Sequence, residues 1–88
     1  MKDKIVLCTD NFERILSTLS ANIKQLCDRQ VALLSQDWRD TRLHTKKLWG
    51  SDDIFSARVT RNYRILFYFD KNDSIIVFDI DNRKDIYR

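Results

Sequence analysis

Three arginines at a three-residue spacing, Arg58, Arg61 and Arg64, are the side chains in this sequence with the clearest chemical use. A guanidinium stays charged at physiological pH and offers a planar fork of N–H donors that matches a phosphate or a carboxylate. Fixed donors of this kind, held on a rigid element, stabilise negative charge that develops during a reaction. The spacing therefore predicts a site for an anionic group.

The elements that must position these arginines are two strands joined by a tight turn. Apolar residues alternate with polar ones over 55–59, so Arg58 should project from the face opposite the apolar side chains. After a polar turn at 60–62, the segment 63–70 is apolar at nearly every position except Arg64. Such a segment is typical of a strand in the middle of a sheet.

Positive charge is concentrated around this hairpin. The chain has a net charge of +3, but residues 1–40 hold six basic and six acidic residues and are neutral overall. Residues 42–64 hold six basic and two acidic residues, a net charge of +4. A polyanion is expected to dock there. The alternative is a solvated surface whose lysines serve solubility.

Composition indicates one small domain, 1–88, that is cytoplasmic. The chain has 88 residues, of which 43% are hydrophobic and 33% charged, with no Pro- or Ser-rich linker to divide it. Its mean hydropathy is −0.47. No apolar run approaches the roughly 20 residues that span a membrane, and the N-terminus lacks the apolar stretch of a signal peptide. No membrane partner is expected.

No metal site and no cofactor are expected. Cys8 and Cys27 lie far apart and form no ligand cluster, so both are expected to be reduced core thiols. His44 has no Cys, His or carboxylate at metal or triad spacing and is expected to be a surface residue.

Periodicity predicts an α+β fold. The expected order is β-α-α-β-β-β, with strands at 4–8, 55–60, 63–70 and 74–81 and helices at 11–19 and 22–35. Asp10 and Glu13 resemble a capping box that begins the first helix. In the last strand, Ile76, Phe78 and Ile80 are expected to share one face. The sheet is expected to be antiparallel, with both helices on one face and the other face open.

Two tryptophans lie in the polar connector between the second helix and the next strand. Trp38 and Trp49 are each able to stack on a nucleic-acid base. A tryptophan beside an apolar leucine more often packs against the core, and core packing is the expectation for both.

Four stretches together resemble the RelE/ParE superfamily of bacterial toxins. They are the basic run 43–50 that ends in Leu-x-Gly, the strand 55–59, the segment 62–67 with its Tyr-Arg-Ile, and the tail 82–88 with its Arg-Lys-Asp-Ile-Tyr-Arg. They cover about the last half of the chain, and the helices match by pattern only. The resemblance implies a RelE-like fold over the whole chain.

The resemblance also implies a function. It indicates the toxin of a type II toxin–antitoxin pair that enters the ribosome and cuts mRNA without a metal, by attack of a ribose 2′-hydroxyl on the adjacent phosphate. The implied partners are a cognate antitoxin, the ribosome and mRNA. The implied catalytic residues are Arg64, at the scissile phosphate, Tyr87, Arg83 and Arg58. The implied RNA-binding residues are Lys46, Lys47, Arg61, Lys84 and Arg88.

Alternatives remain open at this point. Many relatives carry a histidine where this chain has Asn82 or Arg83, and neither replacement serves as a base. Proton transfer then falls to Tyr87, to an acid such as Asp81 or Asp85, or to the ribosome. A ParE-like toxin that binds DNA gyrase, or a catalytically degenerate binding module, needs no such group. The arginines can also pair with acidic residues across the sheet, at 79, 81 and 85.

Overall fold

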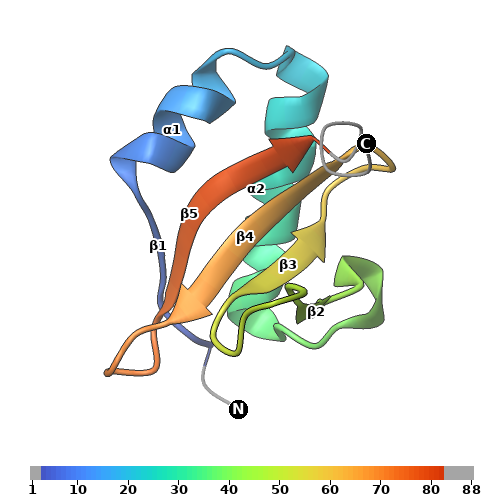
Figure 1. Cartoon of the computed structure of the whole chain (residues 1–88). Helices are drawn as coiled ribbons and strands as arrows, with labels where there is room; N and C mark the ends of the chain where they lie inside the picture. Colours follow the sequence, from blue (N-terminus) through green and yellow to red (C-terminus); the bar gives the residue numbers. More distant parts are fainter. Residues whose placement is uncertain (1–2, 83–88) are drawn as a thin grey trace.

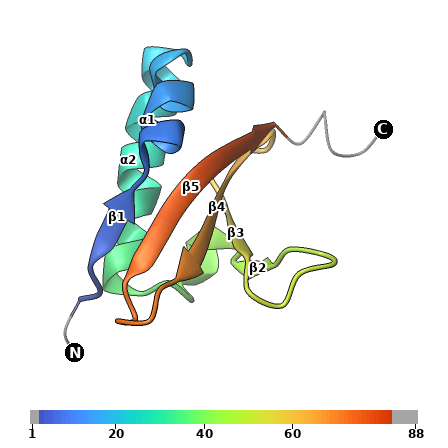
Figure 2. The same cartoon turned by 60° about the vertical axis from the view of Figure 1, so that its left-hand side comes forward.

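Two α-helices cover one face of a five-stranded sheet, and no helix of the described residues covers the other face (Figures 1 and 2). The computed structural model describes residues 3–82. The elements are β1 (Val6–Cys8), α1 (Asp10–Ser17), α2 (Ala21–Gln36), a 3-10 turn η1 (Thr41–Leu43), β2 (Lys46–Lys47), β3 (Phe55–Arg58), β4 (Tyr63–Phe69) and β5 (Ile75–Asn82). The predicted α+β class is confirmed. The last four elements, the strands β2 to β5, carry the candidate site.

The sheet is mixed, so the prediction of a purely antiparallel sheet is wrong. Its strand order is β1-β5-β4-β3-β2, and β1 runs parallel to β5 while the other neighbours are antiparallel. The chain leaves β1 through both helices, reaches the far edge at β2 and returns strand by strand. β4 lies at the centre, as its nearly continuous apolar run predicts.

Side-chain caps fix where the helices begin. Thr9 Oγ1 accepts a hydrogen bond from the Phe12 N–H at 3.2 Å, and Ser20 Oγ accepts one from the Ile23 N–H at 3.3 Å. The expected break between the helices is confirmed. The residue that caps the first helix is Thr9, whereas Asp10 is the first helical residue, where a carboxylate favours the helix dipole.

A β-bulge corrects the expected face of β5. Pairing shifts by one residue between Leu66 and Phe67, so Ile75, Val77 and Ile80 are the buried residues of the strand. Ile76 and Phe78 lie on the other face, and the rings of Phe78 and Tyr68 are 5.6 Å apart there. The prediction that residues 76, 78 and 80 share one face is therefore wrong.

The core lies between the helices and the sheet. Its fully buried side chains include Phe12, Leu34, Leu43, Ile65 and Phe67. Deleting one such side chain typically costs about 2–5 kcal/mol, so this layer fixes the position of β4 and β3. In the described part of the chain, no helix is both long and apolar enough to cross a membrane.

Candidate anion-binding site

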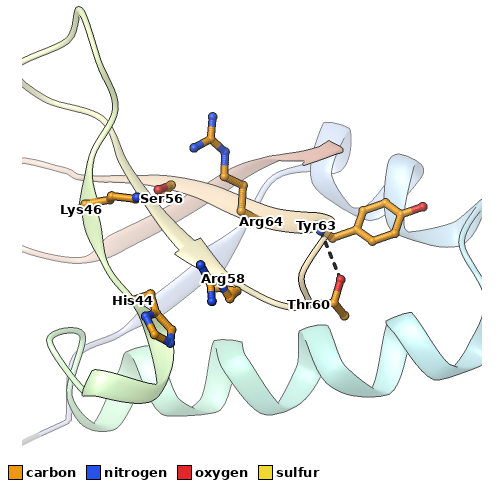
Figure 3. Close-up of a pocket in the computed structure, with 7 residues that line it drawn as sticks. All are labelled: His44, Lys46, Ser56, Arg58, Thr60, Tyr63 and Arg64. Carbon is orange, nitrogen blue, oxygen red and sulfur yellow. Dashed lines mark hydrogen bonds between the residues drawn. The ribbon is translucent and has the colours of Figure 1, made fainter. Parts of the chain in front are cut away.

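Two arginines face each other across the two strands that carry them. Arg58 on β3 is the cross-strand partner of Arg64 on β4, and Arg64 is in turn the partner of Asp81 on β5. Cross-strand partners share a face, and this row lies on the face without helices. Figure 3 shows the Arg64 guanidinium rising from β4 on the side away from α2. Like charges placed directly opposite destabilise a sheet, so packing does not explain this pair.

The Arg64 side chain is held close to the sheet and is only partly neutralised. Its side chain is 15% exposed, and its Nη2 lies 3.9 Å from Asp81 Oδ2, an ion pair longer than a hydrogen bond. Its buried Nε has no hydrogen-bond partner among residues 3–82. A buried donor left unpaired costs about 1–3 kcal/mol. The ion pair with Asp81 is too long to be a hydrogen bond, so the terminal Nη groups of Arg64 can donate to an acceptor from outside, such as a phosphate oxygen.

A small pocket surrounds this pair (Figure 3). Its lining residues come from the segment 44–46, from β3 and from the β3–β4 turn: His44, Lys46, Ser56, Arg58, Thr60, Tyr63 and Arg64. The cavity volume is about 30 Å³, and a cavity needs roughly 10–15 Å³ by the same measure to hold one water molecule. The pocket combines three cationic groups with hydroxyl, phenol and imidazole groups, and its size suits one anionic group rather than a large cofactor.

The segment between α2 and β2 brings His44 and Lys46 to the pocket. Asp40 begins η1 by accepting the Arg42 N–H at 2.9 Å, and it also accepts hydrogen bonds from the Arg42 guanidinium. These hydrogen bonds lower the pKa of Asp40 to about 2. His44 then adopts φ 47°, the left-handed conformation, which ends η1. Lys46 pairs with Ser56 in the sheet, so it lies on the same face as the arginines' row.

Sequence reasoning missed both β2 and the place of His44. A strand of two lysines has no hydrophobic alternation to detect, and the turn that aims His44 depends on a backbone conformation that histidine adopts only sometimes. His44 is exposed, as expected, but it lines the pocket. The one available signal was the Asp40-x-Arg42 cap, which predicts a turn just before it.

A glutamine on α2 ties both parts of the pocket to the helix. Gln30 Nε2 donates to the backbone carbonyl of Arg58 at 2.8 Å and to that of Arg42 at 3.3 Å. The hydroxyl of Thr60 accepts from the Asn62 and Tyr63 N–H groups, each at 3.2 Å, which fixes the β3–β4 turn. These bonds set the separation of the strands at the point where the arginines emerge.

The other predicted site residues are placed apart or lie outside the described residues. Arg61 is exposed in the β3–β4 turn and does not line the pocket. Lys47 pairs with Phe55, which places it on the opposite face from Lys46. The four remaining predictions lie outside the described residues: Arg83, Lys84, Tyr87 and Arg88.

The alternative that acidic residues neutralise the arginines holds only in part. Asp81 pairs loosely with Arg64, whereas Asp79 Oδ1 accepts the Ile80 N–H at 2.8 Å. Arg58 makes no ion pair with another residue of the range 3–82. Asp85, the third acidic residue of this prediction, lies outside the described residues, and within the range 3–82 the site keeps a net positive charge.

The thiols are poor nucleophiles, and the described residues offer no metal site. Burial raises the pKa of Cys8, and it raises that of Cys27 to about 11, so both stay protonated near neutral pH. Among residues 3–82, no three or more His, Cys, Asp or Glu side chains gather closely enough to hold a metal ion. The chemistry open to this pocket is binding and charge stabilisation by arginine and lysine, with imidazole, phenol and hydroxyl groups beside them.

No family model and no curated protein sequence matches this chain. Solved structures do. The toxin–antitoxin complex RelBE2 from Mycobacterium tuberculosis matches with 25% identity and a TM-score of 0.74, over 92% of this chain and 99% of that chain. The RelE–RelB complex from Pyrococcus horikoshii matches with 17% identity and a TM-score of 0.74, over 94% and 97%. The DinJ–YafQ toxin–antitoxin complex from E. coli matches with 8% identity and a TM-score of 0.76, over 98% and 99%.

These matches cover nearly the whole described chain, including the strands that carry the pocket. They agree with the motifs in the last half of the sequence. The chain therefore has the fold of the RelE toxins.

Proposed function

We propose that this chain is the toxin of a type II toxin–antitoxin pair and that it cleaves mRNA on the ribosome. The observation that carries the proposal is the cross-strand pair Arg58 and Arg64, with Lys46 beside it, on the face without helices. Like charges at opposite positions of β3 and β4 cost stability, so the presence of both arginines at one pocket supports a function that binds an anion. A phosphodiester is the anion that best fits this arrangement.

The proposed reaction needs no metal in the toxin. The ribose 2′-oxygen loses its proton and forms a bond to the adjacent phosphorus, and the bond from phosphorus to the 5′-oxygen breaks. The products are a 2′,3′-cyclic phosphate and a 5′-hydroxyl, which takes up a proton. Arg64 and Arg58 would hold the phosphate and stabilise the extra charge of the transition state. Lys46 would contact a neighbouring phosphate.

Proton transfer has a candidate that lines the same pocket. The imidazole of His44 is a general acid–base group, and it lines the same pocket as Arg58 and Arg64, which supports a role in moving the proton of the 2′-hydroxyl or of the leaving oxygen. Tyr87 and Arg83, implied by the family resemblance, remain proposed members of the site.

A protein antitoxin is the proposed partner in the cell. The solved structures that share the fold include toxin–antitoxin complexes. The face that carries the pocket also has apolar side chains, with Leu7 52% and Tyr68 37% exposed and Phe78 beside Tyr68. An acidic, partly apolar segment would cover both regions and neutralise the charge. The proposed location is the cytoplasm, where ribosomes translate mRNA.

One pair of assays separates the candidate functions. Purified toxin is added to an in vitro translation reaction, and cuts in the message are mapped by primer extension. A DNA gyrase supercoiling assay runs beside it. Cuts that need the ribosome support the proposal, whereas inhibited supercoiling without cuts identifies a ParE-like toxin. No effect in either assay identifies a degenerate binding module and contradicts the proposal.

A further inference from the structure

The two tryptophans of the chain have opposite environments. Trp38 packs edge-on against Phe55 and Phe69, with ring centroids 5.5 and 5.0 Å away, which confirms the core packing expected for it. Trp49 is 97% exposed, so the expectation of core packing is wrong for this residue. A tryptophan buries about 150–250 Å² when packed, and exposure of a whole indole forgoes that stabilisation. The exposure of Trp49 therefore favours a contact with a partner outside the described chain.

The backbone around Trp49 is ordered by hydrogen bonds. The Ser51 N–H donates to the Leu48 carbonyl at 3.1 Å, closing a four-residue turn in which Gly50 has φ 84°. This positive φ suits glycine at the third position of a type II turn. The Leu48 N–H donates to Ile54 O at 2.8 Å, closing the base of the loop. Trp49 occupies the outer corner of this turn, so the loop holds its side chain away from the core.

The loop also places Trp49 on the side of the candidate site. In Figure 2 the segment between β2 and β3 extends from the sheet on the side opposite the helices, and in Figure 3 it rises on the same side as the Arg64 guanidinium. Trp49 follows Lys46 by three residues, which span at most about 10 Å. An oligonucleotide bound at the arginines has only a short distance to cover to reach the indole.

We propose that Trp49 is a stacking platform for an unpaired nucleic-acid base. This inference rests on the proposed function, because it takes the ligand of the pocket to be RNA. Base stacking on an aromatic ring suits an exposed indole near a basic pocket. Asp52 and Asp53, exposed in the same loop, repel phosphates. The contact at Trp49 is therefore to a base, while Lys46 and the arginines contact the backbone.

Fluorescence of the two tryptophans tests this contact directly. The probe is a hexa-adenylate with 2′-O-methyl riboses, which cannot be cleaved by 2′-hydroxyl attack. We expect saturable quenching in the wild-type chain and none in Trp49→Phe, whose remaining signal comes from Trp38. By anisotropy of a labelled probe, Trp49→Ala should bind about 5- to 100-fold more weakly, the range of single-base stacking. Trp49→Phe should lose less affinity than Trp49→Leu, because Phe keeps an aromatic face.

The base can belong to the message or to ribosomal RNA, and a second arm distinguishes these sources. Binding of wild type and Trp49→Ala to vacant ribosomes without mRNA is compared with binding to the probe. If Trp49→Ala binds the probe more weakly than wild type does, the base belongs to the message. If it binds only the ribosomes more weakly, the base belongs to ribosomal RNA. If Trp49→Ala binds both the probe and the ribosomes as tightly as wild type does, the proposal is overturned.

Two further outcomes are informative. If Trp49→Ala binds RNA normally but no longer co-purifies with the protein encoded beside it, Trp49 anchors a protein partner and the base-stacking proposal is wrong. If wild type quenches on RNA yet cuts no message, the proposed nuclease function fails and the stacking site stands. Circular dichroism melting controls for folding, and an unchanged midpoint is expected because the side chain packs against little.

Discussion

At the scale of single residues, Arg58 and Arg64 are placed where stability alone would not place them. They are direct cross-strand partners, and the only described acid near Arg64 that forms an ion pair with it is Asp81, at 3.9 Å. Like charges at directly opposite positions of two strands destabilise a sheet. An anion bound in the pocket that both arginines line would offset this cost.

The opposed like charges predict an unusual response to Arg58→Thr. Removing one of two opposed charges and adding a β-branched residue should leave the free energy of unfolding unchanged or raise it by about 0.2–1 kcal/mol. Message cleavage should fall by about 10²–10³, the usual cost of losing one preorganised donor. Urea unfolding and primer extension measure the two effects. A clear loss of stability would show that Arg58 serves the fold.

His44 yields a prediction about proton transfer. Replacement by Gln keeps a polar side chain but removes the general acid–base group, and such groups contribute about 10²–10⁴ to rate. His44→Gln should lower the cleavage rate by that order and flatten its dependence on pH between 6 and 8. The rates are measured in single-turnover cleavage on programmed ribosomes. An unchanged pH profile would assign proton transfer to Tyr87, to an acid or to the ribosome.

At the scale of elements, the site depends on how β2, β3 and β4 are held against α2. Gln30 is the direct link, because its amide donates to the backbone of both the η1 segment and β3. The Asp40 cap and the left-handed His44 then turn the chain into β2. None of these bonds touches the proposed ligand, so their effect on activity is through position.

Gln30→Ala should therefore reduce both stability and activity modestly. Loss of the amide leaves the Arg58 carbonyl without this donor and should cost about 0.5–1.5 kcal/mol in the free energy of unfolding. Cleavage should fall less than for Arg58→Thr, and the loss should show in binding of RNA rather than in the pH profile. Gln25→Ala, on the same helix and exposed, is the matched control. Equal effects of both variants would contradict the positioning role.

The elements also show what the sequence could predict. The apolar run of β4 and the alternation of β3 are strong hydrophobic patterns, and both strands were predicted. The break between the helices was also predicted. β2 is two lysines, and the bulge in β5 reverses the face of Ile76 and Phe78 by a single residue. Of the pocket residues, Arg58 and Arg64 were predicted as catalytic and Lys46 as RNA-binding. The place of His44 and the exposure of Trp49 depend on turns, which the hydrophobic pattern does not predict.

At the scale of the whole molecule, helices bury one face of the sheet, and the other face has a basic region and an apolar region. Towards β2 and β3 it is basic, with Lys46, Arg58 and Arg64. Towards β1 it is apolar, with Leu7 on β1 and Tyr68 on β4 exposed. RNA would bind the basic region, and the proposed antitoxin would cover both the basic and the apolar region. The two partners should therefore compete for the basic region.

The core gives a prediction for alkaline pH. The pKa of Cys27 is raised to about 11 in the folded chain, mainly by burial, so folding favours the protonated thiol. This contribution is complete below the thiol's ordinary pKa of 9.0 and is lost as the pH rises to about 11. Between pH 8 and 11 the wild type should lose about 1–3 kcal/mol more stability than Cys27→Ala. Equal losses in urea unfolding would show that the thiol ionises freely.

The most direct test of the account is Arg64. Arg64→Ala should abolish ribosome-dependent cleavage, with a loss of about 10²–10³ or more, and change the free energy of unfolding by no more than about 1 kcal/mol. Arg64→Lys should restore little, because a point charge lacks the two-pronged contact. Arg29→Ala, which removes an exposed positive charge from α2, should cleave normally. If Arg64→Ala melts much earlier and still cuts the message, Arg64 supports the fold and the proposed site is wrong.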